Sequence, residues 1–304
     1  MTNTAPLAEV RGRHAFITGG SSGIGLGLAR VFSAAGMKVT FTYMRDAHRD
    51  TALAGFPAGN PGVHAIRLDT ADRDAMPRAA DEAEGRFGPV HLLVNNAGVG
   101  LMTAVSQASW QDWDWAIGVN LNGVFSGVHT FLPRMLAHGQ GGHLVTTASS
   151  AGLVAGAVGV YTTTKFAVVG MMEALRIELA GKNIGTSVFC PGLTRTEIAH
   201  SERNRPAALA NATADAGHGH GAAPPIDLMA HAMDPIEAAQ LVLEGVRRND
   251  LYILTHPEFA GAARERAEAI EASWSRVAPP PARAAATSFF LPDIYRVETA
   301  HRRR

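Results

Sequence analysis

The chain has 304 residues, of which 46% are hydrophobic and 18% are charged, and its formal net charge is +0 at pH 7. This is the composition of a globular protein, and the balanced charge gives no reason to expect nucleic acid or an anionic membrane surface as a partner. The single cysteine, Cys190, excludes an intrachain disulfide, and residues 1–13 lack the apolar core of a signal peptide, so we expect a cytoplasmic protein.

Short apolar runs alternate with longer helical patterns along the chain. The first run, His14–Ile17, is followed by a glycine-rich turn, a helical pattern over 24–35 and a β-branched run over 38–43. Further strands are expected over 63–68, 90–95, 142–147, 186–190 and 251–255, and further helices over 75–87, 110–136, 161–180 and 235–248. This alternation favours a parallel sheet covered by helices on both faces. We predict an α/β protein in which residues 1–304 form a single Rossmann-type, doubly wound domain with a seven-stranded parallel sheet.

A glycine-rich turn, Thr18–Gly25, follows the first strand and opens the first helix. Glycines let the backbone approach a pyrophosphate, and the helix N-terminus offers free N–H groups and the positive end of its dipole. A tight turn without a ligand is the alternative interpretation. The flanking strand and helix favour dinucleotide binding, for which the candidate ligands are Gly19, Ser21, Ser22, Gly23, Ile24 and Gly25.

The end of the second strand distinguishes NAD from NADP in folds of this type. An acid there accepts hydrogen bonds from the ribose hydroxyls and repels a 2′-phosphate. In this chain the position falls at Tyr43, no acid stands at 43 or 44, and Arg45 follows. A guanidinium group suits a phosphate, so we predict that NADP(H) is favoured over NAD(H). Asp46, and the absence of a basic residue from 20–22, keep NAD(H) open as the alternative.

Three residues near the middle of the chain could supply acid–base chemistry. Tyr161 and Lys165 lie four residues apart in a helical pattern, so their side chains share one face. A tyrosine, with an ordinary pKa near ~10, exchanges protons poorly at neutral pH unless a nearby ammonium favours the phenolate. Ser149, at the end of the fifth strand, could donate a hydrogen bond to a substrate oxygen. Each residue has a structural alternative, because serine caps helices, tyrosine packs and lysine is solvated.

Two segments break the strand–helix alternation. Residues 193–233 are polar, rich in Ala, Gly and Pro, and follow a strand end, where open sheets bind ligands. We predict a substrate lid there, and a surface insertion without a catalytic role is the alternative. Its His218 and His220 have no cysteine or carboxylate cluster beside them, so no metal site is predicted. Residues 279–304 form an Ala/Pro-rich C-terminal tail, whose basic end 301–304 we expect to be solvated.

Several separated motifs resemble those of the short-chain dehydrogenase/reductase family over residues 10–200. The matching segments are Thr18–Gly25 for TGxxxGxG, Asn95–Gly98 for NNAG, Tyr161–Lys165 for YxxxK, and Pro191, Gly192 and Thr196 for PGxVxT, with Thr194 in place of the valine. Asn120 stands where the family has a helix asparagine. Ser149-Ser150-Ala151-Gly152 fits the family's SxAG pattern, although this places Ser149 one residue closer to the tyrosine than is usual.

The resemblance implies a role for each of these residues. Tyr161 would be the acid/base, Ser149 would polarise a carbonyl, and Lys165 would lower the tyrosine pKa and hold the nicotinamide ribose. Asn120 would anchor a water in the proton relay. For the cofactor, the resemblance implies contacts from Asp69 to adenine, from Thr196 to the carboxamide, and from Asn96, Ala97, Gly98, Pro191 and Gly192.

The resemblance also implies the reaction, which is hydride transfer between NAD(P)(H) and a ketone or secondary alcohol. Residues 111–114 and 251–257 are similar to those of lignin-derived aryl-ether Cα-dehydrogenases, which favours a bulky hydrophobic or aromatic substrate. One alternative is a cofactor-binding sensor or scaffold, which the intact Ser149, Tyr161 and Lys165 disfavour. The other is an epimerase or dehydratase of the extended branch, whose TGxxGxxG spacing this chain does not have.

The family resemblance also predicts self-association. Members commonly form homotetramers by pairing the helices that correspond here to 110–136 and 161–180. The second of these helices carries more apolar surface than one buried face needs, namely Val168, Val169, Met172, Leu175 and Leu179. We therefore expect a homodimer or a homotetramer.

Overall fold

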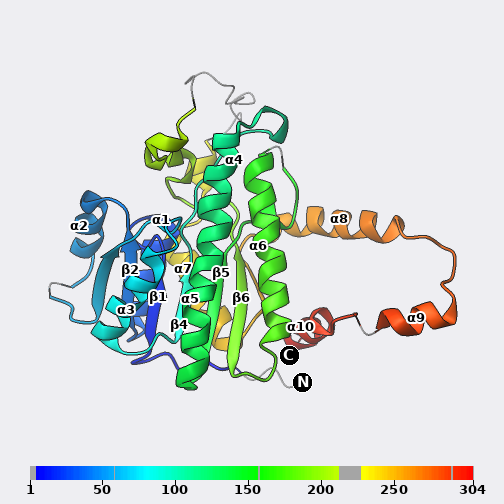
Figure 1. The fold of residues 1–304 in the computed structure, drawn as a ribbon, viewed down its shortest axis with the longest axis horizontal. Helices are drawn as coiled ribbons and strands as arrows, with labels where there is room; N and C mark the ends of the chain where they lie inside the picture. Colours follow the sequence, from blue (N-terminus) through cyan, green and yellow to red (C-terminus); the bar gives the residue numbers. More distant parts are fainter. Residues whose placement is uncertain (1–4, 58, 157, 212–226, 289, 304) are drawn as a thin grey trace.

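Seven parallel strands form one sheet at the centre of the molecule (Figure 1). The computed structural model describes residues 5–57, 59–156, 158–211, 227–288 and 290–303. The strand order is β3-β2-β1-β4-β5-β6-β7, and every neighbouring pair is parallel. The strands are β1 (His14–Ile17), β2 (Lys38–Tyr43), β3 (Val63–Arg67), β4 (Leu92–Asn95), β5 (Gly142–Thr147), β6 (Ile184–Cys190) and β7 (Tyr252–Leu254). The predicted α/β fold with a seven-stranded parallel sheet is confirmed.

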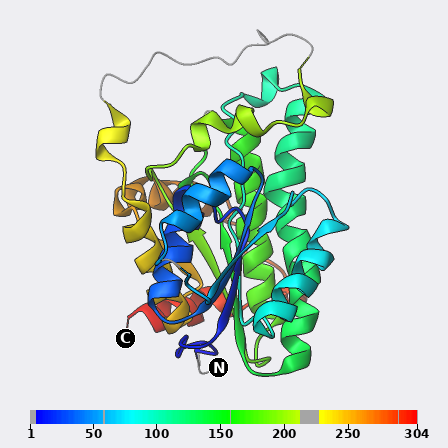
Figure 2. The same ribbon diagram turned by 90° about the vertical axis from the view of Figure 1, so that its left-hand side faces the viewer.

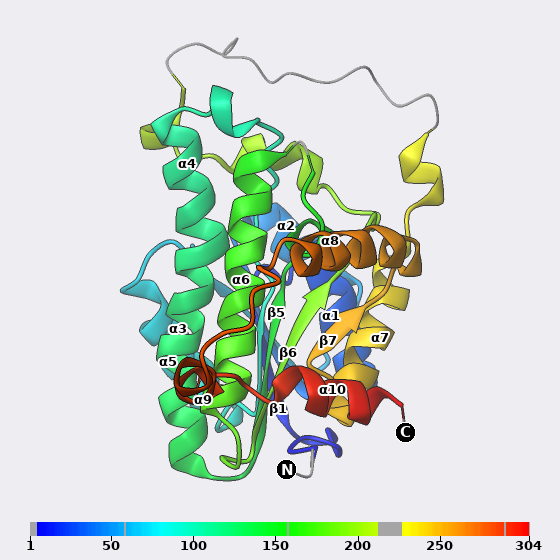
Figure 3. The same cartoon turned by 90° about the vertical axis from the view of Figure 1, so that its right-hand side faces the viewer.

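Helices cover both faces of this sheet. The bounds are α1 (Gly23–Ala34), α2 (Asp46–Ala54), α3 (Ala75–Phe87), α4 (Trp110–Ile117), α5 (Gly123–His138), α6 (Gly159–Glu178) and α7 (Pro235–Arg248). Figure 3 shows α5 and α6 on one side of the sheet and α1 and α7 on the other. Each side has its own apolar core, which is why β5 and β6 are buried along their whole length. Among the described helices, none is long and apolar enough to cross a membrane.

The strand order reverses between β1 and β4, and this reversal positions the site. The chain builds β1, β2 and β3 towards one edge and then returns to place β4 on the other side of β1. The connections that leave the carboxyl ends of β1 and β4 therefore diverge to opposite faces of the sheet. A crevice opens between them, which is where open α/β sheets bind their ligands.

The helix predicted over 110–136 is interrupted in the structure. It consists of α4, a π-helical turn over Gly118–Asn122, and α5. The turn contains Asn120, whose side-chain amide accepts from and donates to the backbone of Val99. Single π turns inside helices are frequent at functional sites, and this one brings Asn120 against the loop that follows β4. Helix α2 was not predicted, because its nine residues have little apolar periodicity.

The C-terminal part of the chain is helical and differs from the predicted tail. It contains α8 (Ala260–Ala272), α9 (Pro281–Ser288) and α10 (Ile294–Arg302). Helices α8 and α9 extend away from the body and bury none of their residues, whereas α10 returns to it (Figure 1). Of the end that was predicted to be solvated, Arg302 is exposed, whereas His301 is only partly exposed. Both bind the carboxylate of Asp250, which is buried and needs cationic partners, a demand that only the tertiary structure reveals.

The argument for surplus apolar surface on the second long helix was also wrong. Four of these five residues lie on the inner face of α6, the fifth directly follows the helix, and all are at most 7% exposed: Val168, Val169, Met172, Leu175 and Leu179. They cover the sheet together with α3 and α5, so one monomer uses them all. The exposed apolar side chains of these helices are different ones, chiefly Phe125 on α5 and Ile177 on α6.

Candidate active site

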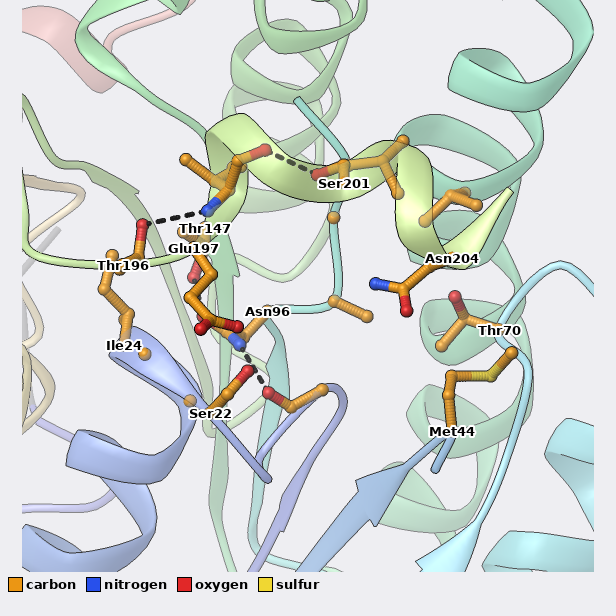
Figure 4. Close-up of a pocket in the computed structure, with 18 of the residues that line it drawn as sticks. Ser22, Ile24, Met44, Thr70, Asn96, Thr147, Thr196, Glu197, Ser201 and Asn204 are labelled. Carbon is orange, nitrogen blue, oxygen red and sulfur yellow. Dashed lines mark hydrogen bonds between the residues drawn. The ribbon is translucent and has the colours of Figure 1, made fainter. Parts of the chain in front are cut away.

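A cavity of about 370 Å³ lies at the carboxyl ends of the central strands, and this volume is typical of a ligand site. Figure 4 shows part of its lining. Most residues predicted from the sequence meet here: Gly19, Ser21, Ser22, Gly23, Ile24, Gly25, Tyr43, Asp69, Asn96, Ala97, Gly98, Ser149, Tyr161, Lys165, Pro191, Gly192 and Thr196. Arg45 and Asn120 do not line it. Residues separated by more than 170 positions in the chain therefore share one cavity.

In the glycine-rich turn, other atoms approach the backbone so closely that a Cβ atom would collide with them. A Cβ atom at Gly25 would lie 2.2 Å from the carbonyl oxygen of Gly19, and one at Gly23 would lie 2.9 Å from the methyl carbon of Thr196. Gly19 and Gly23 also have positive φ angles, of 64° and 51°. The N-cap residue of α1, Ser22, makes no side-chain cap hydrogen bond, so the first N–H groups of α1 face the cavity uncapped. This arrangement fits the diphosphate of a dinucleotide.

The loop after β4 is locked to this turn by hydrogen bonds. The hydroxyl of Thr18 accepts from the backbone N–H groups of Asn96, at 2.9 Å, and Ala97, at 3.0 Å. The side-chain amide of Asn96 donates back to the carbonyl oxygen of Thr18 at 3.1 Å. The two motifs that the sequence places about 75 residues apart thus form one rigid floor under the cavity.

The end of β2 has no acid in the cavity wall. Tyr43, Met44 and His48 line the cavity there. Arg45 turns outward, and its guanidinium donates to the backbone carbonyl of Arg203. Asp46, the acid that kept NAD(H) open as an alternative, pairs with Arg49 at 3.1 Å and does not line the cavity.

The residues of the predicted acid–base group converge at the other end of the cavity. Ser149 follows β5, and Tyr161 and Lys165 lie in the first two turns of α6. Tyr161 is hydrogen-bonded to Ser149. The ammonium of Lys165 donates to the carbonyl oxygen of Thr147 at 2.9 Å and lies 5.4 Å from the centre of the Tyr161 ring. The neighbouring hydroxyl residue, Ser150, does not line the cavity.

Burial dominates the electrostatics of this group. It raises the pKa of Tyr161 above its ordinary value, and the hydrogen bond with Ser149 only partly opposes the rise. Burial also lowers the pKa of Lys165 to about 8, since its side chain is 3% exposed. Lys165 was expected to lower the tyrosine pKa, but in this structure the pKa of Tyr161 is set mainly by burial, and the opposing contribution comes from Ser149.

Asn120 acts through its neighbours rather than on the cavity itself. Its amide oxygen accepts from the N–H of Val99 at 2.8 Å, and its amide nitrogen donates to the carbonyl of Val99 at 3.0 Å and to the hydroxyl of Thr164 at 3.2 Å. The side chain therefore has all its hydrogen-bonding groups engaged within the protein. It fixes the loop after β4 against α6, next to Lys165.

Residues 193–211, the first described part of the segment predicted as a substrate lid, lie over the carboxyl ends of the strands and appear yellow-green in Figure 2. This part continues from Thr196 into a 3₁₀ helix, Ile198–Asn204. Sequence analysis did not single out Glu197, Arg203 or Asn204, all of which line the cavity. A signal was present, because charged residues follow directly on the last cofactor motif.

The middle of this segment lies outside the described residues. His218 and His220 fall there, as does Ile226, so the structure places neither the histidines nor that apolar residue. Over the part of the chain that the structure describes, no group of histidine, cysteine or carboxylate side chains could hold a metal ion. Leu209 and Met229, at the two described ends of the segment, both line the cavity.

Comparison with known proteins agrees with the geometry of this site. A family model described as short chain dehydrogenase matches residues 13–207. The C alpha-dehydrogenase of Sphingobium sp. strain SYK-6 is 38% identical over 266 residues, which cover 87% of each protein. The structure of LigO from the same strain, in its apo form, is 37% identical over 97% of both chains, with a TM-score of 0.72. A short chain dehydrogenase/reductase from Burkholderia phymatum, in complex with NAD, is 34% identical over 90% of this chain and 99% of its own, with a TM-score of 0.78.

The chain belongs to the short-chain dehydrogenase family. It is therefore an oxidoreductase built to bind a nicotinamide cofactor. The resemblance found in the sequence motifs is confirmed.

Burial of the Lys165 ammonium should destabilise the fold in a pH-dependent way. A shift from 10.5 to about 8 corresponds to about 3 kcal/mol at neutral pH. Lys165→Met removes this cost but leaves the Thr147 carbonyl without its donor, which costs about 1–2 kcal/mol. We expect the variant to gain about 1–2 kcal/mol in free energy of unfolding at pH 7, measured with urea.

The pH dependence distinguishes this effect from better packing. Between pH 8 and pH 10.5 the folded lysine is already neutral while the unfolded one is still charged, so the wild type gains stability as pH rises. The advantage of the variant should shrink over that interval. Lys182→Met, at an exposed lysine, is the control and should show no such trend. An advantage that stays constant with pH would contradict the buried-charge explanation.

Proposed function

We propose that the protein is an NAD(P)(H)-dependent alcohol dehydrogenase or carbonyl reductase that interconverts a ketone and a secondary alcohol. The observation that carries this proposal is the convergence of Ser149, Tyr161 and Lys165 at one end of a cavity whose other end fits a dinucleotide. A cofactor-binding sensor would need the glycine-rich turn but not a buried, costly ammonium beside a tyrosine. That cost favours an enzyme over a scaffold.

The proposed mechanism assigns one task to each residue. The hydride that the carbonyl carbon takes up in reduction, and that the alcohol carbon loses in oxidation, would be supplied or taken up by a bound nicotinamide. Ser149 donates a hydrogen bond to the substrate oxygen and polarises it. Tyr161 gives its hydroxyl proton to that oxygen in reduction and takes it back in oxidation. Lys165 stabilises the phenolate that this transfer leaves, and the Thr147 carbonyl holds the lysine in place.

The other cavity residues would hold the cofactor. The first N–H groups of α1 suit the diphosphate, and the floor formed by Thr18, Asn96 and Ala97 keeps the glycine turn open. Asp69 and Thr196 both line the cavity, which is compatible with the proposed contacts to adenine and to the carboxamide.

We propose a bulky hydrophobic or aromatic substrate. Several apolar side chains line the cavity that Tyr161 also lines: Val99, Met102, Trp115, Leu193, Leu209 and Met229. The relative from Sphingobium sp. named C alpha-dehydrogenase supports the same substrate class. Leu209 and Met229 belong to residues 193–233, so we keep the proposal that this segment helps set substrate size.

Tyr161→Phe tests the proposed reaction. The variant lacks the exchangeable proton, so kcat should fall by at least ~10²-fold for any ketone or alcohol in a panel of bulky aromatic and aliphatic compounds, followed at the nicotinamide absorbance. Cofactor affinity should stay within about threefold. Tyr252→Phe is the matched control, because that hydroxyl binds Glu173 on the far side of β6, and it should keep wild-type turnover. Near wild-type kcat in Tyr161→Phe would contradict the mechanism.

We also propose that NADP(H) is preferred over NAD(H). No acid lines the cavity at the end of β2, whereas His48 does and Arg45 lies beside it. To reach a 2′-phosphate, Arg45 must exchange its exposed bond to the uncharged carbonyl of Arg203 for one to a phosphate oxygen. A phosphate is negatively charged and can accept two parallel bonds from a guanidinium, so the exchange is favourable. The NAD found in the relative from Burkholderia phymatum is the observation against this proposal.

Arg45→Ala tests the cofactor preference. The ratio of kcat/KM for NADP(H) to that for NAD(H) should be above one in the wild type. In the variant this ratio should fall by a factor that corresponds to about 1–3 kcal/mol. The ratio is the right measurement, because losing the contact with Arg203 affects both cofactors alike. Arg247→Ala, at an exposed position on α7, should leave the ratio unchanged. A wild-type preference for NAD(H) would refute the proposal.

Finally, we propose a homodimer or homotetramer that pairs α5 and α6. The exposed Phe125 and Ile177 on these helices replace the inner-face residues on which the sequence argument rested. Sedimentation velocity at micromolar concentration should show a dimer or tetramer, and Phe125→Glu should shift it towards monomer. Leu53→Glu, at an exposed position on α2, should not. A wild type that sediments only as a monomer would contradict the proposal.

A further inference from the structure

Residues 196–204 form a strap across the cavity. At one end the methyl group of Thr196 rests against Gly23, at the start of α1. In the middle the hydroxyl of Ser201 accepts from the backbone N–H of Gly100 at 2.9 Å. At the other end Asn204 lies near Thr70 and Met44, at the adenosine side (Figure 4). The strap therefore spans the part of the cavity that would hold the diphosphate.

Positive charge is scarce in this cavity. Among the described lining residues, the lysine and arginine side chains are Lys165 and Arg203, and the acids are Asp69, Asp114 and Glu197. Lys165 is engaged with Thr147 and lies beside Tyr161, at the reaction end. A dinucleotide brings at least two negative charges on its diphosphate. Arg203 is the cation left to meet them within the described lining.

The guanidinium of Arg203 is held in place by hydrogen bonds from its two terminal nitrogens, but its Nε–H has no acceptor. One terminal nitrogen donates to the carbonyl oxygens of His200, at 2.6 Å, and Glu197, at 3.0 Å. The other donates to the carboxylate of Glu197 at 2.7 Å. The Nε atom is buried and has no hydrogen-bond partner. A buried N–H donor without a partner in the wall of an anion-binding cavity points to a missing acceptor.

Glu197 lies in the part of the cavity where a negatively charged ligand would bind. Its carboxylate extends from the strap into the cavity, towards Ser22 and Asn96 (Figure 4). This is the side of the cavity on which the uncapped N–H groups of α1 face a ligand. A carboxylate and a diphosphate would repel each other there, so a bound dinucleotide and this position of Glu197 exclude one another.

We propose that Arg203 is a ligand of the cofactor's phosphate groups and that Glu197 holds it in place until the dinucleotide binds. On binding, the guanidinium exchanges the carboxylate of Glu197 for a phosphate oxygen, and the orphaned Nε–H gains an acceptor. The pair it leaves is partly exposed and therefore weak, whereas a guanidinium–phosphate contact can be bidentate. This inference rests on the proposed function, since it requires a nicotinamide dinucleotide in the cavity.

The test measures binding rather than turnover. ADP-ribose and adenosine each compete with the bound reduced cofactor, whose fluorescence reports its displacement. In Arg203→Ala, affinity for the reduced cofactor and for ADP-ribose should fall by about 10- to 100-fold, while that for adenosine, which has no phosphate, should stay within about twofold. Arg203→Lys should recover part of the loss. Glu197→Gln should bind ADP-ribose about 2- to 10-fold more tightly, because no charged pair has to open.

Arg205→Ala is the matched control for a loosened strap. Arg205 lies two residues further along, does not line the cavity, and anchors the segment to α4 through Asp112 at 2.8 Å. Its loss should affect adenosine and ADP-ribose equally. If Arg203→Ala also weakens both equally, or weakens neither, Arg203 is not a phosphate ligand. A wild type that binds no reduced cofactor would instead refute the proposed function, so the two failures are distinguishable.

Discussion

The burial of the Lys165 ammonium is the constraint on which the site depends. An ammonium that is 3% exposed is costly, and its pKa falls to about 8 for that reason. It is tolerated because β5 ends with the carbonyl of Thr147 aimed at it and because α6 begins close enough to put Tyr161 beside it. Asn120, in the π turn between α4 and α5, ties the β4 loop to Thr164 on the same helix. The carboxyl ends of β4 and β5 and the start of α6 are thus arranged around the Lys165 ammonium.

The two ends of the cavity differ in electrostatics: one end buries a positive charge, and the other end must bind a negatively charged ligand. At the reaction end a positive charge is kept in an apolar place, next to a tyrosine whose pKa is raised by the same burial. At the diphosphate end an anionic ligand must be received with little fixed positive charge nearby. The backbone provides most of what is needed, through the glycine turn and the uncapped N-terminus of α1. If Arg203 is a phosphate ligand, the strap supplies the missing cation, and Glu197 keeps that cation ordered before the ligand arrives.

The same principle explains the C-terminal helices. Asp250 is a buried carboxylate at the start of β7, and Arg248, His301 and Arg302 all bind it. Next to it, Glu298 on α10 accepts from the backbone N–H of Leu251. A basic terminal run that looks like a solvated tail is therefore recruited to satisfy a charge in the body of the protein. Helices α8 and α9, between these anchors and the rest of the chain, bury none of their own residues.

The sequence by itself determined the strands, their parallel arrangement and the family, because these follow from local patterns: alternating apolar runs, a glycine turn after β1, and a tyrosine and lysine one helical turn apart. It also identified the cavity residues that sit in short motifs, from the glycine turn to Thr196, but not the apolar wall or most of the segment after Thr196. Only the tertiary structure decided what depends on distant partners. The apolar residues on the inner face of α6 pack against the sheet of the same molecule. Arg45 donates a hydrogen bond to the carbonyl of Arg203, and Arg203 lines the cavity although its segment contains no motif. Burial and ion pairing join residues far apart in the chain, and no local pattern records them.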